Sequence, residues 1–98
     1  MRLILSPPAE ADIADAYFWY ESQQAGLGAE FLEEVSSAFA AMNFESLRFP
    51  AIYRTIRRAL IHRFPYGIFF VVSGDELAVV AVLHLARDPR RMRARRKP

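Results

Sequence analysis

The chain has 98 residues, of which 53% are hydrophobic and 24% charged, so a single domain over residues 1–98 with a modest core is expected. It contains no cysteine, which excludes disulfides and thiolate metal sites, and its two histidines cannot complete a metal site by themselves. Residues 1–49 carry two basic side chains against eight acidic ones and residues 50–98 carry eleven against three, which predicts two different working surfaces.

The N-terminal apolar run, Leu3 to Leu5, predicts a short first strand. It is too short for a signal peptide, and no stretch approaches the roughly 18 apolar residues of a spanning helix. We therefore expect a cytoplasmic protein that does not enter the membrane. Ser6 followed by Pro7 and Pro8 predicts the start of a helix, because serine caps free amides and proline is tolerated in the first turn.

Two amphipathic helices are predicted next, joined by a tight turn at Gly26–Gly28. Their apolar stripes consist of Ala9, Ile13, Ala16, Tyr17 and Tyr20 in the first, and of Phe31, Val35, Ala38, Phe39 and Met42 in the second. Glu10, Asp12 and Asp15 are expected on other faces of the first helix. The short turn predicts an antiparallel helical hairpin, and both stripes need a sheet to cover them.

The second half predicts that sheet. Residues 55–64 read as one strand, residues 68–72 as a central strand that is apolar on both faces, and residues 77–85 as a closing strand after a turn at 73–76. The fold class is therefore α+β, with the order β-α-α-β-β-β and an N-terminal helical hairpin packed on a mostly antiparallel sheet. Arginines dominate the sequence after Leu85, and a basic, mobile tail is expected over about 90–98.

Three segments in order, 26–35, 57–70 and 81–89, carry a resemblance to a known family. They read GLGAEFLEEV, RRALIHRFPYGIFF and AVLHLARDP, and combine an Arg-Arg pair, Phe-Pro-Tyr and a His-x-x-Arg-Asp-Pro turn. Together they resemble the ParE/RelE superfamily of toxins from bacterial type II toxin–antitoxin systems, and its ParE-like branch most of all. The predicted order of elements agrees with the fold of that superfamily.

The resemblance implies a growth-inhibiting toxin of the plasmid-stabilisation type that binds and poisons DNA gyrase and is not itself an enzyme. It implies that neither a cofactor nor a metal is required. It also implies a ParD-like antitoxin partner, with a homodimer and a heterotetramer with antitoxin both open. The candidate target-binding residues are Arg57, Arg58, Arg63, His84, Arg87, Arg90 and Arg91. The candidate antitoxin-binding residues are Phe18, Trp19 and Leu47, aromatic or apolar side chains suited to anchoring a wrapped antitoxin segment.

Two alternatives stay open. A RelE-like, ribosome-dependent mRNA endoribonuclease would need a base, an acid and a cation, for which Arg63, His84 and Arg87 are the candidates. The chain has no tyrosine after Tyr66 to assist them, and His84 is equally a structural residue at the end of a strand. An inactive module that only binds antitoxin is the other alternative.

The positions of these arginines can also be explained without a target. Arg57 and Arg63 share one face if residues 55–64 form an unbroken strand, since side chains six apart point the same way. The alternative is a solvated strand face, or a pair between Arg63 and Asp88.

Overall fold

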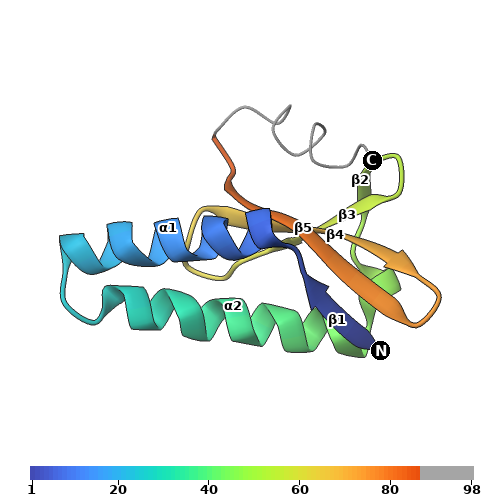
Figure 1. The fold of residues 1–98 in the computed structure, drawn as a ribbon, viewed down its shortest axis with the longest axis horizontal. Helices are drawn as coiled ribbons and strands as arrows, with labels where there is room; N and C mark the ends of the chain where they lie inside the picture. Colours follow the sequence, from blue (N-terminus) through green and yellow to red (C-terminus); the bar gives the residue numbers. More distant parts are fainter. Residues whose placement is uncertain (87–98) are drawn as a thin grey trace.

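The computed structural model describes residues 1–86, so Arg87, Asp88, Arg90, Arg91 and the basic tail expected over about 90–98 lie outside the described residues. Figure 1 shows a sheet with two long helices on one side of it. The elements are β1 (Arg2–Leu5), α1 (Pro7–Gln23), α2 (Leu27–Phe44), the 3₁₀ helix η1 (Ser46–Arg48), β2 (Ala51–Tyr53), β3 (Ile56–Leu60), β4 (Tyr66–Ser73) and β5 (Glu76–His84). None of the helices within residues 1–86 is long and apolar enough to cross a bilayer.

The strands form one sheet in the order β1-β5-β4-β3-β2. β1 runs parallel to β5, and every other neighbouring pair is antiparallel. The predicted α+β class, the helical hairpin and the mostly antiparallel sheet are therefore confirmed. β4 lies between β5 and β3, as its two apolar faces predicted.

Two features of the sheet differ from the prediction. The short strand β2 was not expected, and the single strand predicted over 55–64 is wrong because β3 ends at Leu60. Beyond it, Arg63 has a left-handed backbone with φ of 74°, and the Ile61 amide donates to the Tyr66 carbonyl across a tight loop. The condition that would place Arg57 and Arg63 on one strand face is therefore not met.

The two helix starts use different caps. Ser6 caps α1 as predicted, its Oγ accepting from the Ala9 amide at 3.2 Å. α2 begins after Gly26, which has φ of 90° and offers no side chain. Glu21 of α1 takes that role, since its two carboxylate oxygens accept from the Gly26 amide at 2.9 Å and the Gly28 amide at 3.0 Å. An anionic acceptor at a helix N-terminus also suits the helix dipole.

The hairpin packs closely where the helices meet. A Cβ at Gly28 would lie 2.7 Å from the Tyr17 ring and 2.8 Å from the Tyr17 carbonyl oxygen, so only glycine fits there. Between the helices and the sheet, the main core contains Phe31, Met42, Ile68, Phe70, Leu77, Val79 and Val82, all nearly inaccessible to solvent. The opposite face of the sheet carries a smaller buried group, Ile56, Phe69, Ala81 and Leu83.

One side chain of α1 departs from its predicted face. Asp12 was expected away from the apolar stripe, but it is 8% exposed and buried between α1 and the sheet. Its Oδ2 accepts from the backbone amide of Val82 at 2.9 Å. Because this contact depends on β5 lying beneath α1, helical periodicity alone could not reveal it.

Candidate functional site

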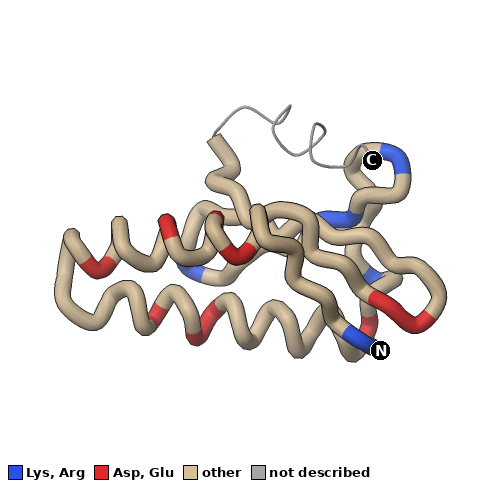
Figure 2. The backbone as a smooth tube through the Cα atoms, viewed as in Figure 1, with Lys and Arg blue, Asp and Glu red and all other residues tan. Residues whose placement is uncertain are grey.

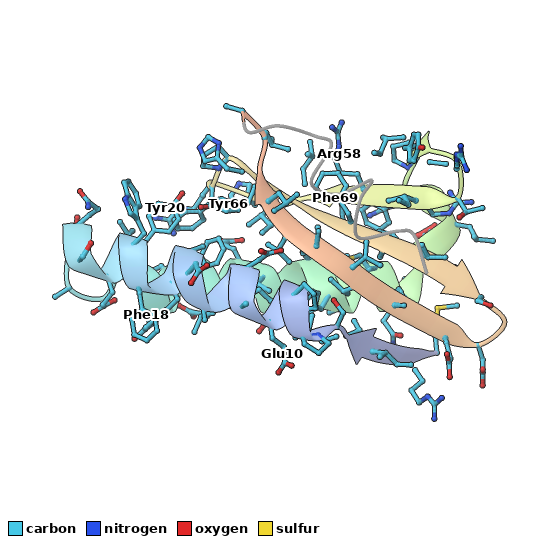
Figure 3. All side chains as sticks on the ribbon, turned by 45° about the horizontal axis from the view of Figure 1, so that its top comes forward. Glu10, Phe18, Tyr20, Arg58, Tyr66 and Phe69 are labelled. Carbon is cyan, nitrogen blue, oxygen red and sulfur yellow. The ribbon has the colours of Figure 1, made fainter. Side chains whose placement is uncertain are left out.

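A cleft lies between the second half of α1 and the β4–β5 pair. It consists of two adjoining cavities of about 260 and 340 Å³, and both are lined by Trp19 and Tyr66. The first cavity is also lined by Asp12, Asp15, Ala16, Val82 and Leu83, and the second by Tyr20, Pro65 and His84. Tyr20 and Tyr66 lie beside each other at this end of the molecule, with ring centroids 6.1 Å apart (Figure 3). Trp19 and His84, predicted for two different partners, thus share one cavity.

His84 ends β5 and its surroundings constrain its chemistry. The imidazole packs edge to face on Tyr66, with ring centroids 5.3 Å apart. Its Nδ1 accepts a hydrogen bond from the Ala86 amide at 3.1 Å. An accepting Nδ1 places the proton of the neutral ring on Nε2, which can then donate a hydrogen bond. The arrangement therefore suits a hydrogen-bond donor to a bound partner.

Arg63 is turned toward the helices. Its Nη2 lies 2.8 Å from Glu30 Oε1 of α2, and its Cζ lies 5.3 Å from the centroid of the Phe64 ring. The neighbouring His62 Nδ1 is 3.7 Å from Glu34 Oε1, one helical turn further along α2. These contacts tie the β3–β4 loop to α2. A guanidinium that is already paired with a carboxylate of the same chain attracts an anionic group of a target less strongly.

Arg57 and Arg58 point to opposite faces of β3. Nη1 of Arg57 donates to the Phe49 carbonyl at 2.6 Å and to the Leu47 carbonyl at 3.4 Å, so this side chain holds η1 against the edge of the sheet. Arg58 lies on the other face, where its Nε is buried without a hydrogen-bond partner. The predicted arginines therefore do not form one strip along β3.

A second concavity, which we call the α1 groove, lies on the far side of α1. Its volume is about 360 Å³, and its lining is apolar apart from Glu10: Leu5, Glu10, Ile13, Ala14, Tyr17, Phe18 and Leu32. Phe18 is 68% exposed at this groove. Figure 3 shows Phe18 and Glu10 on the same side of α1, away from Tyr20. An apolar groove with one carboxylate at its border fits an apolar segment that carries a cation.

The three predicted antitoxin anchors lie on three different surfaces. Phe18 borders the α1 groove, Trp19 lines the cleft beside His84, and Leu47 projects from η1, where it is 68% exposed. One short segment of a partner would not fill all three positions at once. A longer segment that covers Trp19 would also cover His84.

The structure adds site residues that the sequence analysis missed. Leu32 lines the α1 groove, and its position off the second apolar stripe was an available signal. Arg48 and Arg54 flank β2, a strand that the sequence did not predict. Within residues 1–86 there is no cluster of three or more side chains able to hold a metal ion.

Known proteins share the sequence family and the fold of this chain. A family profile described as "ParE toxin of type II toxin-antitoxin system, parDE" matches residues 3–89. Among solved structures, a chain from the "Chromosomal ParDE TA system from P. aeruginosa" aligns with a TM-score of 0.78 at 17% identity, covering 87% of this chain and 96% of that chain. At that identity the structural likeness shows a shared fold. The search of curated proteins returned no match.

Proposed function

The chain belongs to the ParE toxin family of type II toxin–antitoxin systems, and on this basis we propose that it inhibits bacterial growth by binding and poisoning DNA gyrase. A ParD-like antitoxin neutralises it in the cytoplasm. The toxin acts by contact and carries out no chemistry of its own. The match over residues 3–89 is the observation that carries this proposal.

The state of His84 favours a gyrase-binding toxin over the alternative of an mRNA endoribonuclease. Cleavage of RNA through its 2′-hydroxyl needs a general base close to a cation. The Nδ1 of His84 is engaged by the Ala86 amide, and Arg63 is paired with Glu30. Neither side chain is prepared for that role, whereas a donating imidazole and cationic surfaces suit a protein that binds.

The α1 groove is the surface that we assign to the antitoxin. An amphipathic segment would place apolar side chains against Ile13, Tyr17 and Phe18, and a lysine or arginine near Glu10. Continuing across α1, the same chain would reach Trp19 and cover His84 in the cleft. Neutralisation would then hide part of the surface that faces the target. A heterotetramer with antitoxin and a homodimer of free toxin are both compatible with a groove on one side of the molecule.

One experiment separates the proposed function from its alternatives. Purified toxin is added to gyrase in a supercoiling and DNA-cleavage assay and, in parallel, to ribosomes programmed with messenger. Linear, cleaved DNA that disappears when antitoxin is added supports gyrase poisoning. Cut messenger with unaffected gyrase overturns it in favour of the ribonuclease. No response in either assay, together with harmless expression in cells lacking the antitoxin, indicates an inactive antitoxin-binding module.

A further inference from the structure

The end of the molecule formed by η1, β2 and β3 concentrates arginines that form no ion pair within residues 1–86. Figure 2 shows acidic residues along both helices, at the β4–β5 turn and at the start of η1, and basic residues around η1, β2 and β3. The acidic residue at η1 is the exposed Glu45, which forms no ion pair in the described part of the chain. Within residues 1–86, the arginines that form ion pairs are Arg2, with Glu76, and Arg63, with Glu30. Arg48 and Arg54, which flank β2, are not among them. Their charge is available to a partner.

Stacking on aromatic rings orients these two guanidinium groups. Cζ of Arg48 lies 5.1 Å from the centroid of the Phe49 ring, and Cζ of Arg54 lies 5.3 Å from that of the Tyr53 ring. A guanidinium has five N–H donors, so one that lies near an aromatic ring keeps donors for other partners. Arginine donors bind carboxylates in a two-pronged geometry.

Exposed apolar side chains lie in the same stretch of chain. Phe44, the last residue of α2, is 86% exposed, Leu47 on η1 is 68% exposed, and Ile52 of β2 is 37% exposed. The backbone around Leu47 is braced, because Arg57 donates to the Leu47 and Phe49 carbonyls and Phe49 packs on Phe70 in the core. We call Phe44, Leu47, Arg48, Ile52 and Arg54 the η1–β2 surface.

Backbone strain at Arg54 is a separate indication that this surface has a function. Tyr53 pairs with Ile56, so Arg54 and Thr55 form a two-residue hairpin turn. Arg54 has φ of 53°, a left-handed conformation that such turns normally give to glycine, asparagine or aspartate. Arg54 thus has a long cationic side chain in a conformation that glycine would adopt without strain, and strained residues of this kind cluster at binding sites.

We propose that an acidic patch of a partner protein docks on the η1–β2 surface. Carboxylates of the partner bind Arg48 and Arg54, and an apolar side chain of the partner contacts Leu47. The inference rests on the proposed function, because the partner it implies is the protein that the toxin inhibits. Apolar side chains between the arginines favour a protein partner over nucleic acid, because protein interfaces are enriched in aromatic residues and arginine. A phosphate backbone is bound by polar and charged groups and would leave Phe44, Leu47 and Ile52 without contacts. This surface and the α1 groove share no residue.

The test uses the full chain and a variant that separates binding from folding. Arg54→Gly removes the guanidinium and also relieves the left-handed φ, so its melting temperature should equal or exceed that of the wild type. Arg48→Glu reverses the second charge. The matched control is Arg2→Ala on β1, at the opposite edge of the sheet, which also loses one positive charge.

Growth arrest, gyrase inhibition and antitoxin affinity are measured for each variant. We expect Arg54→Gly and Arg48→Glu to lose growth arrest and to inhibit gyrase at least about tenfold more weakly, as for close charge pairs at interfaces. Antitoxin affinity should stay within about twofold, and Arg2→Ala should resemble the wild type in all three. Growth arrest by Arg54→Gly at wild-type potency overturns the proposal.

The same measurements distinguish this proposal from the proposed function. If the wild-type toxin arrests growth but does not inhibit gyrase, the proposal that gyrase is the target is wrong. Growth arrest by the two arginine variants then still tests whether the η1–β2 surface is needed for toxicity. Wild-type toxin that does not arrest growth overturns both. Salt-sensitive binding of toxin to duplex DNA alone, lost in both arginine variants, would assign the surface to nucleic acid and overturn docking on protein.

Discussion

The buried carboxylate of Asp12 accepts a hydrogen bond from the Val82 amide at 2.9 Å, and this contact joins α1 to β5. β1 pairs with β5 only as far as Leu5 and Val79, so the outer edge of β5 continues beyond its partner strand. The chain turns into α1 at that point, and Asp12 meets the edge of β5 that β1 has left. An unpaired amide buried there would be costly.

Replacement of Asp12 by alanine should lower the free energy of unfolding by about 1–3 kcal/mol, because it leaves a buried amide without its acceptor. Urea unfolding followed by circular dichroism measures the change. Asp15→Ala is the control, since Asp15 is exposed on the same helix, and it should change stability by less than about 0.5 kcal/mol. Equal losses in the two variants would show that the Val82 contact contributes nothing.

Gly28→Ala tests the close approach of the helices through the sign of its effect. Alanine in an unobstructed helix would stabilise by up to about 1 kcal/mol relative to glycine. Here the new Cβ would meet the Tyr17 carbonyl oxygen at 2.8 Å, and the resulting strain should destabilise by about 1–3 kcal/mol. Thermal and urea unfolding report the sign. Ser36→Ala, at an exposed position of α2, supplies the background, and a gain in stability from Gly28→Ala would contradict the packing described.

Arg63 and Glu30 should behave as a structural pair. A double-mutant cycle with alanine at both positions should give a coupling of about 0.2–1 kcal/mol, the range for half-exposed ion pairs. We expect the Arg63→Ala variant to keep its inhibition of growth. If Arg63→Ala abolishes growth arrest while Glu30→Ala retains it, Arg63 contacts the target directly, as the sequence first predicted.

Phe18→Asp tests the assignment of the α1 groove. A charge in place of an exposed anchor should weaken antitoxin binding by about 2 kcal/mol or more, roughly thirtyfold. Isothermal titration with purified antitoxin measures the loss, and growth arrest should persist while becoming resistant to antitoxin. Phe44→Asp is the matched control, since Phe44 is also exposed and aromatic but lies in the η1–β2 surface. Unchanged antitoxin affinity in Phe18→Asp would remove the groove from the antitoxin interface.

Much of the architecture was predictable because it depends on local periodicity. The stripes through Phe31, Val35 and Met42 and the cap at Ser6 are properties of neighbouring residues, and the structure confirms them. β2 was missed because three residues carry too little pattern to recognise. The break after Leu60 was missed because Arg63, in the loop that follows, has a left-handed backbone conformation. The secondary-structure propensities of the residues do not indicate this conformation.

The candidate site was predictable only in its parts. Phe18 and Trp19 are adjacent in sequence, yet one borders the α1 groove and the other lines the cleft with His84, because successive helical residues point about 100° apart. Arg57 and Arg58 likewise take opposite faces of one strand. A list of basic residues could not show which of them already have partners.

The sequence alone determined the two helices, the order of the main strands and the family, because periodicity, caps and motifs are carried by residues close together in the chain. Only the tertiary structure decided which charges remain available to a partner. Glu30 and Arg63 are 33 positions apart and Asp12 and Val82 are 70 apart, and the packing of the hairpin on the sheet brings each pair into contact. Interactions at such separations depend on the whole fold, so the arginines of the η1–β2 surface could be distinguished from the others only once the chain was folded.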